Sequence, residues 1–211
     1  MKCVIIAGGD FTATNQIRTI LDQAERIICA DSGAGHLRPL DIVPHILMGD
    51  FDSITPDDLA FFESQGSRVE RFPARKDQTD SELCIDRALE LHASEIILLG
   101  ATGSRMDHTL ANILLLEKIA AHDIPVRIID ATNEITLVTD RIELDGVPGE
   151  PVSIIPVTET AEGVSFQGLE YPLTEGRMKR ASSLGISNRF AKTTARISVR
   201  SGKLLVSRSI D

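Results

Sequence analysis

Short apolar runs alternate with amphipathic stretches through residues 1–131 of the chain. The runs are rich in β-branched residues and have the length of buried strands. They lie at residues 2–7, 26–30, 45–49, 68–72, 95–99 and 125–130. Between them, Ile17, Ile20 and Leu21 follow the spacing of one helix face. Thr55 followed by Pro56 has the pattern of a capped helix start, and Thr79 with Glu82 forms a capping box. This alternation predicts a mostly parallel α/β sheet with helices on both faces.

After Asp130 the pattern changes to short β-rich segments separated by Gly, Pro or Asp turns, without helical periodicity. The segments lie at residues 133–138, 140–144, 151–157, 163–167, 195–200 and 203–208. They predict a small all-β sandwich. We therefore expect two domains, an α/β domain over residues 1–131 and a β-sandwich over residues 132–211.

The charge is unevenly distributed between these two parts. The 211 residues include 22 Lys/Arg and 31 Asp/Glu, a formal net charge of −9, and residues 1–131 carry all of this excess acid. An acidic domain argues against a duplex nucleic-acid partner, which needs a basic face, and it permits a metal site. No apolar run approaches the ~18–20 residues of a membrane span, and the first residues do not resemble a signal peptide. A cytoplasmic protein with no membrane partner is the expectation.

Acidic residues follow the predicted strands at the points where the strands end. They are Asp31 after the second strand, Asp50 and Asp52 after the third, Asp77 and Asp80 after the fourth, and Asp107 after the fifth. In a parallel sheet these carboxylates collect at the carboxyl-end edge, where open α/β sheets bind ligands. Neighbouring carboxylates repel, and Mg²⁺ is the cation that prefers such oxygen ligands. A single acid can instead cap a helix or stabilise its first turn, so Asp77, Asp80 and Asp107 retain that alternative.

Glycine-rich loops at the same edge predict an anion site. Residues 99–105 (LGATGSR) join a strand to a helix, so backbone amides and a helix N-terminus can bind phosphate, with Arg105 available for a bidentate contact. Lys76, beside Asp77, is a second candidate for a phosphate contact. The loop is not a P-loop, because the Lys-Ser/Thr pair that completes that motif is missing.

Taken in order, several motifs resemble those of the thiamine pyrophosphokinase family. They are ADSGA at 30–34, GDFDSI at 49–54, KDQTD at 76–80, GATGSRMDH at 100–108, GLEYPL at 168–173 and GISN at 185–188. The resemblance implies an N-terminal catalytic domain, a C-terminal sandwich that helps to bind thiamine, and a homodimer with sites at the subunit junction. It implies transfer of the pyrophosphoryl group of Mg²⁺-ATP to the hydroxyl of thiamine, giving thiamine diphosphate and AMP.

The same resemblance assigns roles to individual residues. Asp50, Asp52 and Asp80 match the magnesium-binding catalytic acids. Positions around the nucleotide match Asp31, Thr79, Arg105 and Asp107, and the thiamine-binding turn matches Ser187 and Asn188. The chain departs from many relatives in having Ser32 in place of glycine. It also has no Trp, so we expect Phe190 to supply the aromatic face that stacks on thiamine.

Other functions are compatible with parts of this pattern. Residues 46–53 also resemble the D-x-D motif of a haloacid-dehalogenase-type phosphatase, although that motif belongs on the first strand and needs a later Lys and acid pair. A D-x-D glycosyltransferase is disfavoured by the short chain and by an aromatic content of 4%. A non-enzymatic nucleotide or metal sensor is the third alternative. Product analysis discriminates these functions, because only pyrophosphoryl transfer releases AMP in step with thiamine consumption.

Overall fold

The computed structural model describes residues 1–209. The chain divides between Ala131 and Thr132 into two compact units, which we call the first and second units. In the described residues no helix is long and apolar enough to cross a membrane.

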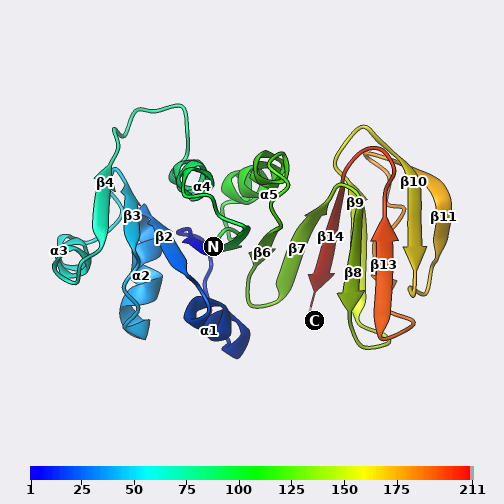
Figure 1. Cartoon of the computed structure of the whole chain (residues 1–211), viewed down its shortest axis with the longest axis horizontal. Coiled ribbons are helices and arrows are strands. Elements are labelled where there is room, and N and C mark those ends of the chain that lie inside the picture. The colour runs from blue at the N-terminus through cyan, green and yellow to red at the C-terminus, as the bar shows by residue number, and fades with distance from the viewer. Residues whose placement is uncertain (210–211) are drawn as a thin grey trace. The chain divides into compact units, whose positions relative to one another are not determined.

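The first unit is a parallel sheet with helices on both faces, which confirms the predicted fold class (Figure 1). The strand order is β6-β5-β1-β2-β3-β4. The strands are β1 (Lys2–Ile6), β2 (Arg26–Ala30), β3 (Ile46–Gly49), β4 (Arg68–Arg71), β5 (Glu95–Leu99) and β6 (Val126–Ile129). The α-helices are α1 (Asn15–Asp22), α2 (Ala34–Leu37), α3 (Pro56–Ser64), α4 (Asp80–Glu90) and α5 (Met106–Ala120). Two short 3₁₀ turns, Asp31–Gly33 and Arg38–Leu40, flank α2.

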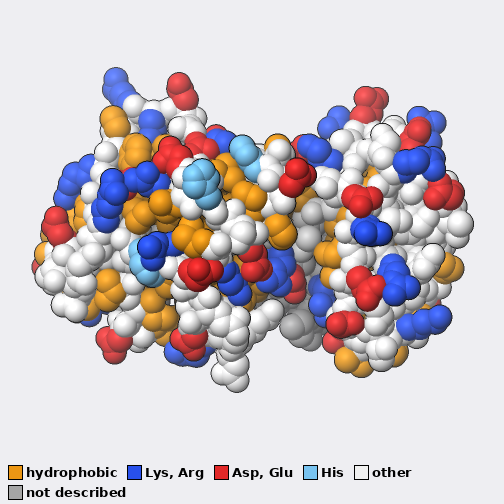
Figure 2. Space-filling view, viewed as in Figure 1, with side chains coloured by type: hydrophobic (Ala, Val, Ile, Leu, Met, Phe, Trp, Pro, Cys, Tyr) orange, Lys and Arg blue, Asp and Glu red, His pale blue; other side chains and the backbone are white. Residues whose placement is uncertain are grey.

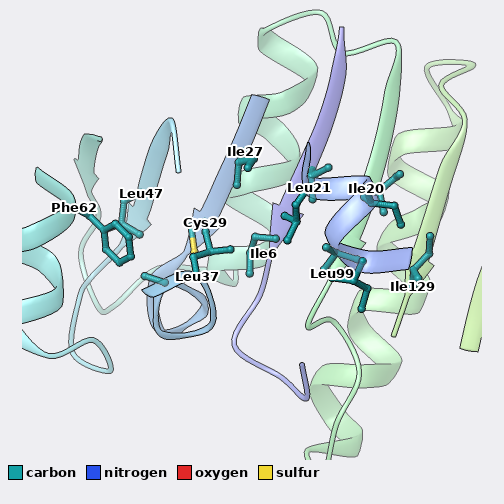
Figure 3. Packing of buried hydrophobic residues seen from close by; sticks show 14 of the residues in the cluster. Ile6, Ile20, Leu21, Ile27, Cys29, Leu37, Leu47, Phe62, Leu99 and Ile129 are labelled. Carbon is teal, nitrogen blue, oxygen red and sulfur yellow. The ribbon is translucent and has the colours of Figure 1, made fainter. Parts of the chain in front are cut away.

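The core of the first unit explains why β1, β2, β3 and β5 are almost entirely apolar. The edge strand β4 differs from the expected buried strand, since three of its four residues are charged and none is fully buried. Val4 and Ile6 of β1, together with residues of β2, β3, β5 and β6, pack with side chains of α1, α2 and α3 in one cluster (Figure 3). Residues between them face α4, which contacts β1, β2 and β3 on the other side. Because both faces of the sheet are covered at β1, β2, β3 and β5, period-2 alternation of apolar and polar residues is absent from these four strands.

Threonine caps begin two of the helices at the positions that the sequence predicts. Thr55 Oγ1 accepts a hydrogen bond from Asp58 N at 3.1 Å, with Pro56 at the first helical position of α3. Thr79 Oγ1 accepts one from Glu82 N at 3.2 Å and so begins α4 at Asp80. The second cap brings Asp80 to the edge of the sheet.

The second unit consists of two antiparallel sheets, with strand orders β12-β9-β14-β7 and β11-β10-β13-β8. The strands are β7 (Asn133–Val138), β8 (Arg141–Asp145), β9 (Pro151–Pro156), β10 (Thr160–Gln167), β11 (Leu173–Lys179), β12 (Asn188–Arg189), β13 (Thr194–Ser198) and β14 (Leu204–Ser209). Ile154 and Val206 from one sheet share a buried cluster with Phe166 and Ile197 from the other. The two sheets therefore form the predicted sandwich.

Two strands of the second unit are missing from the sequence prediction, the two-residue β12 and the longer β11. β11 carries Glu175, Gly176 and Arg177 in its middle, and only Met178 is buried. It pairs with β10 alone, at the edge of its sheet. An edge strand buries few side chains, so its apolar alternation is too weak to read from the sequence.

Candidate active site

A cleft of about 540 Å³ opens at the carboxyl ends of the strands of the first unit. It is lined by residues 7–10, 30–32, 79–81 and 100–105, with Asp50, Asp52, Ser53, His108, Thr109 and Asn112. The chain runs outward from β1 to β4 and then returns to the other side of β1 as β5. The loops after β1 and β5 thus meet at the topological switch point, the usual ligand position in an open α/β sheet.

Four of the predicted acids line this cleft. Asp31, Asp50 and Asp52 each offer a carboxylate oxygen, and these oxygens lie within 4.8 Å of one another. Asp80 lines the same cleft, and Lys76 Nζ lies 3.0 Å from Asp80 Oδ1. The geometry of this contact does not satisfy a hydrogen bond, so Lys76 and Asp80 form an ion pair only. The structure therefore brings acids from the segments after β2 and β3 and from the start of α4 into a single negative site.

Asp31 is the buried member of this group. Its residue is 7% exposed, and its Oδ1 is buried with no hydrogen-bond partner among the described residues. Burial raises the pKa of Asp31, and although a hydrogen bond from Ser53 lowers it, the charges of Asp80, Asp50 and Asp52 raise it further. A cation beside Asp31 would relieve both the lost solvation and the repulsion.

The backbone between Asp50 and Asp52 adopts an unusual conformation. Phe51 has φ of +62°, in the left-handed region that an aromatic residue enters at a cost of about 1–2 kcal/mol. Asp52 N donates a hydrogen bond to Asp50 Oδ1 at 3.3 Å across this turn. The Phe51 ring packs against the core, and the Arg71 guanidinium lies 5.0 Å from the ring centroid. These contacts stabilise the turn that holds both carboxylates at the cleft.

Glycines form the opposite wall of the cleft. Gly9 N donates to Gly100 O at 2.7 Å, and Asp10 N donates to Thr102 O at 2.8 Å. Gly100 has φ of +62°, and a Cβ at this position would lie 2.3 Å from Ala7 O. Only glycine fits there. The sequence reasoning missed the 8–10 loop, although two glycines directly after the first strand were a readable signal of close backbone approach.

The other predicted nucleotide residues lie at the margin of the cleft. Arg105 lines it and pairs with Asp107, Nη2 to Oδ2 at 2.6 Å, at the exposed start of α5. The hydrogen bond from Arg105 lowers the pKa of Asp107, so this carboxylate stays ionised and engaged with the guanidinium. Thr79 lines the cleft and also caps α4. Charges of both signs are interspersed over the visible face of the first unit outside this site (Figure 2).

The predicted acceptor residues lie in the second unit. Asn188 is buried, and both polar atoms of its amide are hydrogen-bonded: Nδ2 donates to Tyr171 O at 2.8 Å, while Oδ1 accepts from Tyr171 N at 3.0 Å and from Arg189 N at 2.9 Å. Asn188 therefore fixes the Tyr171 backbone, and it is only 2% exposed. Ser187 is exposed, with φ of +56°, and its N donates to Ser153 Oγ at 3.0 Å.

The expectation for Phe190 is wrong. Phe190 directly follows the short strand β12, is 2% exposed and belongs to the core of the sandwich. The ring lies so close to Gly146 that a Cβ there would be 2.7 Å from it. The ring has no face for a ligand. The exposed aromatic of this region is Tyr171, at 63%, which the sequence reasoning did not single out as a site residue.

An acid-lined, glycine-walled cleft at the switch point of a parallel sheet defines an α/β enzyme that handles a phosphorylated ligand. Comparison with known proteins narrows this class. The family profile described as "Thiamin pyrophosphokinase, catalytic domain" matches residues 17–128, and the profile described as "Thiamin pyrophosphokinase, vitamin B1 binding domain" matches residues 136–204. The thiamine pyrophosphokinase of Bacillus subtilis (strain 168) is 34% identical over 215 residues, covering all of both chains.

Solved structures agree with this match. The crystal structure of the Bacillus subtilis enzyme has a TM-score of 0.90 at 32% identity, covering all of both chains. That of the Geobacillus thermodenitrificans enzyme has a TM-score of 0.85 at 33% identity, covering all of this chain and 98% of the other. The chain belongs to the thiamine pyrophosphokinase family. Its activity is thiamine diphosphokinase activity, with ATP as the pyrophosphate donor, and these matches give no support to the phosphatase alternative.

Proposed function

We propose that the acidic cleft of the first unit is where the pyrophosphoryl group leaves ATP and joins the hydroxyl of thiamine. One observation carries the proposal: three carboxylate oxygens, from Asp31, Asp50 and Asp52, converge within 4.8 Å beside a wall of glycine backbone. A metal-binding acid cluster and an anion-binding loop on facing walls are the two features that phosphoryl transfer requires.

The donor set fits magnesium. The ligand atoms are carboxylate oxygens, and the buried Asp31 Oδ1 has no hydrogen-bond partner among the described residues. Asp50, Asp52 and Asp80 would hold Mg²⁺ with Asp31. When bound, the ion supplies positive charge that offsets the charge developing on the phosphoryl oxygens.

The remaining residues of the cleft would bind the donor and orient the attack. The 100–105 loop and the start of α5 offer backbone amides, and Arg105 offers a guanidinium, to the phosphates. Lys76, Thr79 and Asp107 lie near the nucleotide in this proposal. Because AMP is the leaving group, attack falls on the β-phosphorus. A carboxylate, that of Asp80 or Asp50, orients the thiamine hydroxyl and accepts its proton late in the transfer.

The reaction is tested with ATP labelled separately at the β- and the γ-phosphorus. Both labels are expected in the thiamine product, with one AMP formed for each thiamine consumed. The same samples analysed by chromatography check the stoichiometry. Transfer of the γ label alone, with ADP as the second product, would make the protein a monophosphoryl kinase and contradict the proposal.

We propose further that Tyr171 and Ser187 contact the acceptor. The Tyr171 ring is exposed while its backbone is fixed on both sides by Asn188, and Ser187 adjoins Asn188 in the chain. An exposed aromatic ring on a backbone held in place suits the flat, positively charged thiamine, since cation–π attraction adds to stacking. The homodimer and the cytoplasmic location expected from the sequence stay predictions.

Tyr171→Ala is expected to raise KM for thiamine about tenfold and to leave KM for ATP within about twofold, because the ring contributes only to acceptor binding. Tyr171→Phe, which keeps the ring, is the matched control and should retain the wild-type KM. Steady-state kinetics with each substrate varied in turn measure both constants. Equal increases in both KM values would show that Tyr171 has no separate acceptor role.

A further inference from the structure

We infer that Thr109 and Asn112 of α5 are positioning residues that hold the 100–103 loop in the form that accepts phosphate. The inference rests on the proposed function, in which this loop binds the phosphates of ATP. Neither residue belongs to the set of nucleotide-binding positions discussed above, although both line the cleft.

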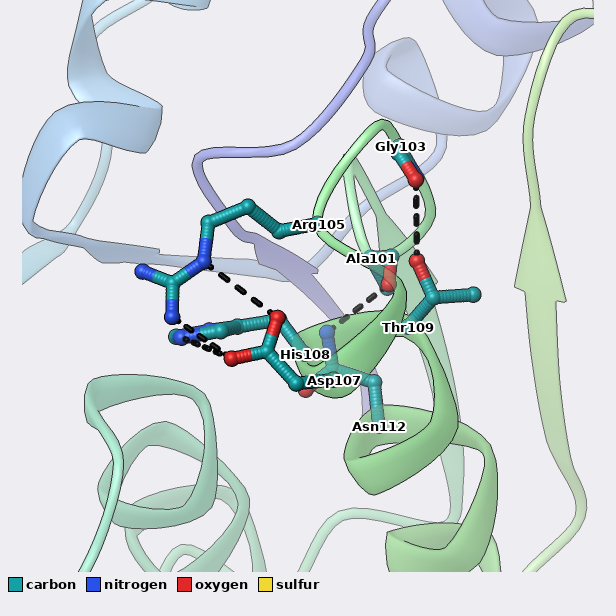
Figure 4. Close-up of polar contacts among 7 residues, drawn as sticks. All are labelled: Ala101, Gly103, Arg105, Asp107, His108, Thr109 and Asn112. Carbon is teal, nitrogen blue, oxygen red and sulfur yellow. Dashed lines mark hydrogen bonds and ion pairs between the residues drawn. The ribbon is translucent and has the colours of Figure 1, made fainter.

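Every carbonyl of the loop accepts a hydrogen bond. Gly100 O accepts from Gly9 N at 2.7 Å, and Thr102 O accepts from Asp10 N at 2.8 Å. The other two bonds come from α5 side chains (Figure 4): Ala101 O accepts from Asn112 Nδ2 at 2.8 Å, and Gly103 O accepts from Thr109 Oγ1 at 3.2 Å. The Thr109 hydroxyl also accepts from Gly103 N at 3.1 Å and so fixes both ends of that residue.

This arrangement matters because of the sign of the peptide dipole. A carbonyl oxygen that faces a phosphate repels it, whereas an amide N–H attracts it. In a glycine-rich loop a peptide group can rotate so that its carbonyl replaces its N–H at small energetic cost, because glycine adopts both positive and negative φ. With all four carbonyls bonded to protein donors, the loop is held against such a peptide flip.

The two side chains come from one face of one helix. Thr109 and Asn112 are three residues apart in α5, so they share a face and move together. Asn112 is only 6% exposed, and burying an amide in this way is favourable only when it is hydrogen-bonded. Its hydrogen bond to the loop explains why a polar side chain occupies a buried position of α5, where the other buried residues, Leu116 and Ile119, are apolar.

The test compares Thr109→Val, which keeps the shape and removes the hydroxyl, with Thr109→Ser, which restores it. Binding of three probes is measured by calorimetry with Mg²⁺: an ATP analogue with a methylene between the α- and β-phosphorus, AMP, and adenosine. We expect Thr109→Val to weaken binding of the analogue about tenfold, because one hydrogen bond that orders the loop is lost. Thr109→Ser is expected to retain the wild-type affinity for the analogue. Adenosine, which has no phosphate, should bind both variants as it binds the wild type.

Thr19→Val is the matched control, since Thr19 is a helical threonine of α1 whose hydroxyl donates to Asn15 O at 2.9 Å, away from the cleft. It should change no affinity. If Thr109→Val does not fold, Asn112→Asp makes the same comparison, because a carboxylate in place of the amide repels Ala101 O. Unchanged affinity for the analogue, or an equal loss for adenosine, would overturn the inference. Failure of the proposed function would appear separately, as wild-type enzyme that transfers the γ label alone.

Discussion

Asp52→Asn is expected to lower kcat by on the order of a hundredfold or more, equivalent to ~2.7 kcal/mol of lost transition-state stabilisation. The reason is the convergence of Asp52 with Asp31 and Asp50, which places its carboxylate among the proposed magnesium ligands. Asparagine keeps the size and one oxygen of the side chain but removes the charge. Steady-state turnover across a range of Mg²⁺ concentrations measures the effect, and the loss should be largest where Mg²⁺ is limiting.

Asp57→Asn is the matched control for this variant. Asp57 is an exposed acid in the first turn of α3, a few residues along the chain and outside the cleft lining. Its replacement should leave kcat unchanged. A folded Asp52→Asn enzyme with wild-type turnover at limiting Mg²⁺ would remove Asp52 from the metal site.

Phe190→Ala is expected to lower the free energy of unfolding by about 3–5 kcal/mol, the usual cost of removing a fully buried aromatic ring. Phe190 is 2% exposed and packs with Val152, Ile154 and Val206 in the core of the second unit. The truncation leaves a cavity that the two sheets cannot close. Chemical denaturation followed by far-ultraviolet circular dichroism measures the change.

Tyr171→Ala serves as the comparison for stability, because it removes an aromatic ring that is 63% exposed. Its unfolding free energy should change by less than about 1 kcal/mol. The two variants should therefore separate, with Phe190→Ala acting on stability and Tyr171→Ala on KM for thiamine. Wild-type stability of Phe190→Ala together with a raised KM would restore Phe190 as a ligand contact.

The amino-acid sequence was sufficient to predict most of the fold. All six strands of the first unit lie where the sequence predicts them. For β1, β2, β3 and β5 the reason is that strands buried on both faces are apolar along most of their length, whereas the edge strand β4 carries three charged residues. The caps at Thr55 and Thr79 could be predicted because a helix cap depends only on residues three positions apart in the sequence. The strand β11 could not be predicted, because it is defined by its pairing with β10 and not by an apolar pattern of its own.

The placing of acids at strand ends was also a property of the sequence, because parallel strands end at one edge whatever their order. How those acids meet was decided by tertiary structure. The left-handed turn at Phe51 depends on the packing of its ring against the core and on Arg71 from the neighbouring strand. The core residues and Arg71 that contact the Phe51 ring are brought to it only by folding, so no local sequence pattern predicts this turn.

The second unit shows the same division most clearly in Ser187, Asn188 and Phe190. The motif located this turn, but the direction of each side chain in and beside the two-residue strand β12 depends on how the sheets pack around it. In the folded structure Phe190 is buried in the core, and the Asn188 amide is hydrogen-bonded to the backbone of Tyr171. Residue types and their spacing follow from the chain alone, whereas exposure and hydrogen-bond partners arise from contacts between segments far apart in sequence, and only the folded structure determines them.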